Sequence, residues 1–273
     1  MQRILALIAA FSIGLAASVT AQADARTDER LEKSRKVFES FSNLSEQAIP
    51  TWLLERAYGI VVVPDLVKAA IIFGGRGGKG VMAVRRPDGT WSNPVFVTMG
   101  GANVGFQWGL QSTDVVLVLM SRRSVEGIAG GKVTLGADAS VAAGPLGRSA
   151  AATTDATFKA QVLSYSRSEG LFAGVALDGG VIVIDDSANE TAYGVAGILP
   201  SQILEGRVGS APQAARDFTA ALERATNAAA APATQPPPAP APAPAPAKPG
   251  DSSTGGVTTY PMEDPSPGAP PPE

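Results

Sequence analysis

The sequence predicts a single α+β domain, a compact antiparallel sheet curled into a small barrel or sandwich and flanked by N- and C-terminal helices. Three observations predict this class. Apolar residues recur at helical spacing near the start, short β-prone runs separated by turn residues fill the middle, and a second helical pattern follows them. The gaps between the β-prone runs are too short for helical crossovers, so we expect antiparallel pairing.

The first 23 residues resemble a secretory signal. Arg3 supplies a minimal positive region, residues 4–17 are apolar, and residues 21–23, Ala-Gln-Ala, form a small-x-small cleavage site. An uncleaved membrane anchor is the alternative, because the apolar run approaches the ~18 residues that a span needs. We favour cleavage and expect an exported protein, periplasmic or secreted, with association to a membrane left open. The chain has no cysteine, so its stability must come from its core and not from disulfides.

The other end of the chain is rich in proline. Of the 22 prolines, 15 follow Ala230, first in a stretch of Ala-Pro alternation and then in an end rich in Gly, Ser and Pro. Such a composition does not form a packed core, so we expect a folded domain over residues 24–230 and a disordered tail over residues 231–273. The tail is interpreted either as a spacer in the envelope or as a solubilising segment.

Helices are expected at both ends of the domain. Residues 24–47 carry one apolar stripe, with Arg30, Lys33, Arg35 and Lys36 largely on other faces. This helix either packs on its own domain or lies in a lipid interface. A short helix over 51–58 follows Pro50. Later helical segments are expected at 123–128, 186–193, 201–204 and 212–229; the stripe of the first helix consists of Leu31, Val37, Phe38, Phe41 and Leu44.

The sheet is expected from short runs of β-branched and aromatic residues bounded by Gly, Pro, Asn and Asp. Glycines inside several runs indicate bends or bulges in a strongly curved sheet. The expected strands are residues 59–64, 69–73, 81–85, 94–99, 104–110, 115–120, 132–135, 158–166, 171–177 and 181–184.

Residues 73–80, FGGRGGKG, invite comparison with a phosphate-binding P-loop. The comparison fails, because Phe73 stands where the first glycine belongs and Gly80 where the magnesium-binding hydroxyl belongs. The run that follows is β-prone and closes at a turn signature, residues 86–89, so we predict a β-hairpin with a glycine-rich turn. Arg76 and Lys79 would project from that turn, either as an anion site or as solvated charges at a flexible tip.

Basic residues cluster around this stretch. Five lie within 19 positions, and Arg122, Arg123 and Lys132 form a second group whose distance from the first the sequence leaves open. Arginine grips phosphate bidentately and lysine acts as a point charge, so the set suits anionic head groups. The alternative is a solvated strand face partly neutralised by Asp65 and Asp88. The five residues are Lys68, Arg76, Lys79, Arg85 and Arg86.

Several function classes are disfavoured by composition. There is no histidine and no cysteine, which removes the commonest general base, metal ligand and thiolate nucleophile, and the net charge of −3 argues against nucleic-acid binding. Residues 185–189 are expected to cap a helix and not to bind calcium, since the alternating oxygen ligands are missing. We therefore expect no cofactor, no metal and no enzyme. The carboxylates considered for catalysis are Asp138, Asp155, Asp178, Asp185 and Asp186.

Several motifs resemble the SYLF domain family in order and spacing over about residues 25–224. They are FGGRGGKG at 73–80, WSNP at 91–94, GFQWG at 105–109, GADAS at 136–140 with GPLG at 144–147, SYSRSEGLF at 164–172, Asn189, and Tyr193 with Gly194. The resemblance implies lipid binding. Phosphoinositide recognition and actin binding are attributed to eukaryotic members, whose amphipathic start contributes to membrane contact.

Carried to this chain, the resemblance implicates the helix with Lys33, Arg35 and Lys36 beside the glycine-rich hairpin. The export signal makes actin an unlikely partner here. We predict a non-enzymatic lipid-binding module of the cell envelope that recognises anionic phospholipid head groups or a membrane surface. The runner-up is a scaffold for an envelope protein or cell-wall polymer without lipid dependence, and a hydrolase is third. The predicted lipid-binding residues are Lys33, Arg35, Lys36, Lys68, Arg76, Lys79, Arg85 and Arg86.

Overall fold

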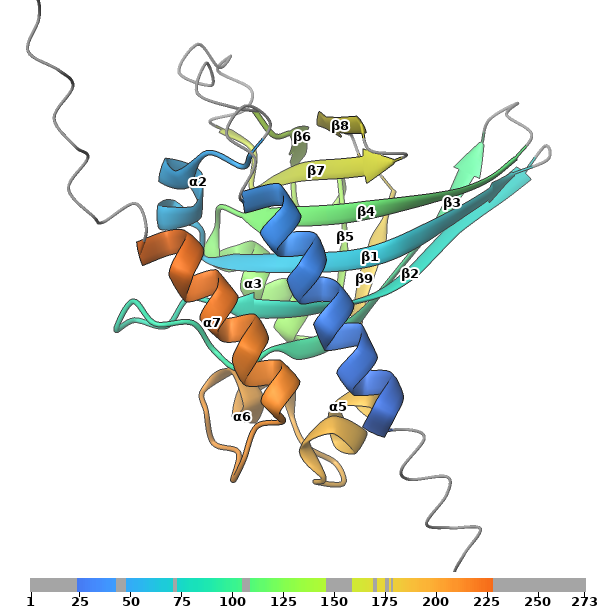
Figure 1. Ribbon diagram of the computed structural model, residues 1–273. Helices are drawn as coiled ribbons and strands as arrows, with labels where there is room; N and C mark the ends of the chain where they lie inside the picture. The colour runs from blue at the N-terminus through green and yellow to red at the C-terminus, as the bar shows by residue number, and fades with distance from the viewer. Residues whose placement is uncertain are drawn as a thin grey trace, which may run out of the picture. The chain divides into compact units, whose positions relative to one another are not determined.

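A curled sheet forms the centre of the protein (Figure 1). The computed structural model describes residues 24–42, 48–70, 73–104, 109–145, 159–168, 171–174, 177 and 179–227. Within them the sheet has nine strands in the order β5-β9-β3-β2-β1-β4-β7-β6, and β8 pairs with β7. Helices at both ends complete the α+β class that the sequence predicts. The strands are β1 Gly59–Ala70, β2 Phe73–Val84, β3 Val95–Val104, β4 Gly109–Leu119, β5 Lys132–Thr134, β6 Val141–Ala143, β7 Val162–Ser168, β8 Leu171–Gly174 and β9 Val181–Ile184.

Two long helices lie across one face of this sheet (Figure 1). They are the N-terminal helix, residues 24–42, and α7, Gln213–Asn227. Leu31, Phe38 and Phe41 of the N-terminal helix are fully buried, so its apolar stripe faces the domain's own core. Leu44 and the rest of residues 43–47 lie outside the described residues. The shorter helices are α2 Thr51–Arg56, α3 Arg122–Ala129, α5 Asp186–Tyr193 and α6 Pro200–Leu204.

The start of α5 confirms the predicted capping role of residues 185–189. The carboxylate of Asp185 accepts a hydrogen bond from the backbone N–H of Ala188 at 3.3 Å. Asn189 is fully buried, and its side-chain oxygen accepts from the backbone N–H of Phe96 at 2.9 Å. These contacts satisfy buried backbone donors and attach α5 to β3.

The glycine-rich stretch is not a turn, and this part of the sequence-based prediction is wrong. Residues 73–80 form most of β2, while the link from β1 to β2 falls on residues 71 and 72, outside the described residues. The separate strand predicted over 69–73 is also wrong, since its ends belong to β1 and β2. A hairpin turn does follow β2, where Gly89 has φ 86 and Arg86 N–H donates to the carbonyl of Thr90.

A β-bulge in β1 explains two of these glycines. Val62 pairs with Val81 and Val67 with Gly77, so β1 carries one residue more than β2 between these pairs. Asp65, inside the bulge, has φ 48, the one positive φ of a non-glycine in the described chain. A β-carbon on Gly80 would lie 2.1 Å from the carbonyl oxygen of Val62, and one on Gly78 would lie 2.7 Å from the Val63 side chain. Only glycine allows β2 this approach.

The expectation of antiparallel pairing holds for seven of the eight strand pairs in the described chain. The exception is β6, which pairs in parallel with β7 and which the sequence did not predict. Its sequence, Val-Ala-Ala, holds only one of the β-branched or aromatic residues on which the strand predictions rest. Among the described helices, none combines the length and the apolar character that crossing a bilayer requires.

Candidate functional site

Three neighbouring strands bring four arginines to one end of the sheet. Gly59, the first residue of β1, pairs with Val84 near the end of β2 and with Leu119 at the end of β4. The segment before β1 therefore meets the segments after β2 and β4. Backbone hydrogen bonds fix this meeting, because Tyr58 N–H donates to the carbonyl of Leu119 at 2.8 Å and Arg85 N–H to that of Tyr58 at 2.9 Å.

The residues at this end surround an open cleft of about 550 Å³. We call it the arginine cleft, after Arg56, Arg85, Arg86 and Arg122. These residues follow directly from the topology: Arg56 ends α2, Arg85 and Arg86 follow β2, and Arg122 begins α3 just after β4. The full lining consists of Glu55, Arg56, Ala57, Tyr58, Arg85, Arg86, Pro87, Gly89, Met120 and Arg122.

Arg85 is the fixed member of the set. Its guanidinium donates to the carbonyl oxygens of Leu54 at 2.9 Å, Ala57 at 3.2 Å and Gly89 at 3.1 Å. It also lies over the ring of Trp91, 4.7 Å from the centroid. Burial lowers the pKa of Arg85, and the charge of Glu55 opposes that shift. An arginine stays protonated under such a shift, so a positive charge is held in place in the lining of the cleft.

The other three arginines are attached through carbonyls or rings. Arg86 donates to the carbonyl oxygen of Leu204 in α6 at 3.2 Å. The guanidinium of Arg122 lies over Tyr58, 5.5 Å from the ring centroid, and that of Arg56 lies over Trp52 at 5.8 Å. These contacts position each guanidinium without neutralising it.

None of the four cleft arginines forms an ion pair within the described part of the chain. Glu55 lines the cleft, and Asp88 directly follows the lining residue Pro87 in the turn after β2. Neither carboxylate lies within ion-pair distance of the four arginines. At least eight of the other 15 basic residues in the described part of the chain do form ion pairs. The paired residues are Arg30, Lys33, Arg35, Lys36, Lys79, Arg167, Arg207 and Arg224. Four guanidinium groups without a carboxylate partner are thus gathered at the cleft, and Glu55 is the acidic side chain in its lining.

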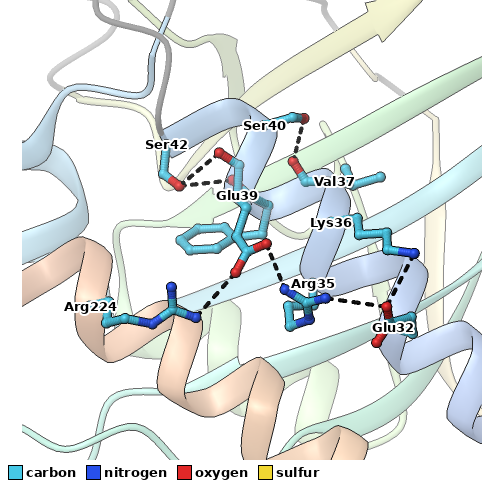
Figure 2. A network of polar contacts seen from close by, with 9 residues as sticks. Glu32, Arg35, Lys36, Val37, Glu39, Ser40, Ser42 and Arg224 are labelled. Atoms are coloured by element: carbon cyan, nitrogen blue, oxygen red, sulfur yellow. Dashed lines mark hydrogen bonds and ion pairs between the residues drawn. The ribbon is translucent and has the colours of Figure 1, made fainter.

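The basic residues of the N-terminal helix are engaged in a surface network of ion pairs. Figure 2 shows Glu32 between Lys36 and Arg35, and Glu39 between Arg35 and Arg224 of α7. Each contact joins residues one turn apart or two neighbouring helices. In the described structure, no ion pair or hydrogen bond joins the predicted residues Lys33, Arg35 and Lys36 to a residue that lines the arginine cleft.

Lys33 and Lys79 line a second, smaller groove of about 260 Å³ between the N-terminal helix and the bulge of β1. This groove is mixed in charge, because Lys33 pairs with Asp65 at 3.4 Å and Lys79 with Asp185 at 3.6 Å. Glu29 lines it as well. Carboxylates already compete for these cations, so this groove is the weaker anion site.

Arg76 and Lys68 lie opposite each other on β2 and β1. The guanidinium of Arg76 donates to the carbonyl oxygen of Leu177 at 3.1 Å and lies close to Gly101 and Gly180. Arg76 therefore links β2 to the segment before β9 instead of projecting from a turn. Of the eight predicted residues, the structure brings only Arg85 and Arg86 to the cleft.

Sequence reasoning missed Arg56 and Tyr58 and left the place of Arg122 open. The signal that would have found them is position: each of these residues lies within three residues of the end of β1 or β4. Reading that signal requires the strand order, which no local pattern supplies.

The described residues contain no group of acidic side chains that could hold a metal ion. The carboxylate of Asp138 accepts from the backbone N–H of Thr134 at 2.7 Å, and Asp185 binds Arg30 and caps α5. Ser164 and Ser166 of the SYSR stretch are buried, with Tyr165 fully enclosed between them. Asp155 and Asp178 lie outside the described residues. The arrangement at the cleft offers hydrogen-bond donors and positive charge, which is the chemistry of anion binding.

Comparison with known proteins gives consistent matches. Residues 100–225 match the family described as Ysc84: Las17-binding protein actin regulator. Protein YSC84 of Saccharomyces cerevisiae is 40% identical over 191 residues, which is 67% of this chain and 40% of that protein. LAS seventeen-binding protein 3 of the same species is 39% identical over 204 residues, covering 72% and 44%.

A vertebrate relative extends this result. SH3 domain-containing YSC84-like protein 1 of Xenopus laevis is 34% identical over 182 residues, covering 64% of this chain and 54% of the relative. The chain thus spans about half the length, or less, of the curated relatives that it matches.

Proposed function

Because the protein carries a domain of the Ysc84 (SYLF) family, we propose that it is a non-enzymatic lipid-binding module of the cell envelope. In this proposal it recognises anionic phospholipid head groups at the arginine cleft. The observation that carries the proposal is the gathering of four arginines without carboxylate partners around one open cleft. Guanidinium groups suit phosphate because they donate in a planar fork, and those fixed in advance lose less entropy on binding.

The cell envelope is proposed from the sequence of residues 1–23, which resembles a secretory signal. An exported protein meets the outer faces of membranes, where anionic phospholipid is an available ligand. For an exported protein, actin, which the family description names, would lie in another compartment, so actin is not part of the proposal.

Vesicle flotation tests this function. The purified exported chain, with its N-terminus determined by mass spectrometry, is mixed with neutral or anionic vesicles at low and high salt. We expect binding that requires anionic lipid and weakens with salt, because the Debye length falls from about 10 Å at 0.1 M to about 3 Å at 1 M. A chain that stays with the soluble fraction under every condition refutes the proposal.

The variant that locates binding is Arg56→Gln with Arg122→Gln. Both side chains are exposed and hold no ion pair within the described structure, so the fold should persist. Each basic residue near an anionic surface contributes about 1 kcal/mol, so losing two should weaken binding by roughly 30-fold. Arg85 is unsuitable for this test because its guanidinium also holds the carbonyls of Leu54, Ala57 and Gly89.

A protein-binding scaffold is the second candidate. The family description names Las17 binding and actin regulation, and both properties belong to interactions between proteins. Under this alternative the arginine cleft binds an acidic segment of an envelope protein, and anionic vesicles have no effect. Co-purification of a partner that persists after detergent removal of lipid, and that is lost in the Arg56→Gln, Arg122→Gln variant, would favour this candidate over the first.

A further inference from the structure

A smaller hollow of about 140 Å³ adjoins the arginine cleft and shares part of its wall. The shared residues are Tyr58, Arg85, Pro87 and Arg122; Val84, Val125 and Glu126 line only the hollow. Three of its side chains, those of Val84, Pro87 and Val125, are aliphatic, and we call it the valine hollow. An apolar recess thus lies beside the arginines that face the cleft.

The elements fix this neighbourhood. Val84 is the last residue of β2 and directly precedes Arg85, while Val125 follows Arg122 by three positions on α3. Residues three apart on a helix lie on the same face, so Arg122 and Val125 line one wall together. Both valines are partly buried against the core, which holds the walls of the hollow in place.

We infer that the cleft and hollow together take an amphiphilic phosphate, its phosphate at the arginines and the first carbons of its apolar part between Val84 and Val125. The inference rests on the proposed function and makes the ligand more specific. A ligand that carries only charge, without an apolar part, would contact the arginines alone and leave the hollow filled with water. A phosphate joined to a hydrocarbon chain satisfies both parts of the site at once.

The size of the hollow limits what enters it. A water-sized group takes about 30 Å³ of liquid volume, so the hollow admits roughly four or five groups of methylene size. This is the beginning of one chain and not a whole lipid. The remainder of a membrane lipid would stay outside, whereas a short alkyl phosphate in solution would fit completely. Both sources present the same chemistry to the protein.

Acidic residues at the rim restrict where the phosphate can lie. Glu126 lines the hollow and Glu55 lines the cleft. A phosphate in the hollow would face Glu126 and only two arginines, whereas one in the cleft faces all four. Electrostatics therefore orients the ligand with its charge in the cleft and its chain toward the valines.

Calorimetric titration of the full chain with inorganic phosphate, ethyl phosphate and hexyl phosphate, at constant ionic strength, tests this inference. Each methylene buried in the hollow should improve affinity by about fourfold. Hexyl phosphate should therefore bind at least tenfold more tightly than inorganic phosphate. Equal affinity for the three ligands would overturn the inference.

Two variants assign the effect. Val125→Ser should remove most of the gain from the chain while leaving inorganic phosphate unchanged, and Arg122→Gln should weaken all three ligands. Val195→Ser, at a valine that is 46% exposed in the loop before α6, is the matched control and should change nothing. A chain-length dependence that Val125→Ser leaves undiminished would show unspecific adsorption and refute the site.

Flotation of the same preparations separates this inference from the proposed function. Vesicle binding without any preference for alkyl phosphates would leave the lipid-binding module standing and remove the valine hollow from it. A preference for alkyl phosphates without vesicle binding would assign the site to a soluble amphiphile and refute membrane recognition.

Discussion

At Gly80 the sheet leaves no room for a side chain. A β-carbon there would lie 2.1 Å from the carbonyl oxygen of Val62, a backbone atom that moves only with the strand. We expect Gly80→Ala to destabilise the domain by about 3 kcal/mol or more, as overpacking against backbone does. Gly77→Ala is the matched control, because nothing lies within 4 Å of its β-carbon, and it should change stability by less than 1 kcal/mol.

Urea unfolding of both variants measures the difference. Similar midpoints for the two would contradict the close approach of β2 to the bulge in β1. This residue pair also shows where sequence reasoning stopped. The glycines are visible in FGGRGGKG, but what they face, a bulge at Pro64 and Asp65 on another strand, is not. A turn was the local explanation, and a long-range contact is the actual one.

At the scale of elements, one ion pair joins the N-terminal helix to α5. Arg30 binds Asp185 at 2.9 Å, with side chains only 9% and 15% exposed, and its guanidinium also donates to the carbonyl of Val97 and lies over Phe96. Burial raises the pKa of Asp185, but the hydrogen bond and charge of Arg30, with that of Lys79, outweigh burial and leave it below its ordinary value.

A depressed carboxyl pKa makes stability depend on pH in the acid range. The contribution of Asp185 is present above its unfolded pKa of about 3.9 and is lost as pH falls through the lower folded pKa. Asp185→Asn keeps a helix-capping side chain but leaves Arg30 without its charge partner, so we expect a loss of roughly 3 kcal/mol at pH 7.

Unfolding free energies between pH 7 and pH 2 check this expectation. The gap between wild type and Asp185→Asn should be constant down to about pH 4 and then narrow. A gap that keeps its size in acid would mean that the pair contributes through packing and not through charge.

Helices whose limits are marked by nearby residues in the sequence were predicted well. Helix α5 was predicted with its observed limits, and its cap at residues 185–189 was expected; α7 was placed within two residues. Strand order was not predictable in this way. The cleft forms because β1 lies between β2 and β4. Sequence spacing alone therefore could not predict that Arg122 lies near Arg85.

At the scale of the whole molecule, the net charge argues against binding to an anionic membrane, whereas the distribution of the charge argues for it. The chain carries 25 acidic residues against 22 basic ones, so a uniform distribution would be repelled weakly by an anionic membrane. Pairing offers a way out of the conflict, because eight basic residues of the described chain lie in ion pairs with carboxylates, whereas none of the four at the arginine cleft does. Under the proposed function, attraction to an anionic membrane would depend on this one surface and not on the total charge.

Two variants of equal charge separate these explanations. Arg56→Gln with Arg122→Gln, and Lys33→Gln with Lys36→Gln, each remove two positive charges, but the lysines are already paired with Glu29, Asp65 and Glu32. If distribution governs binding, the arginine variant should lose roughly 30-fold in affinity for anionic vesicles at low salt, and the lysine variant less than about threefold. Equal losses would mean that total charge governs binding, and a larger loss in the lysine variant would move the membrane contact to the N-terminal helix.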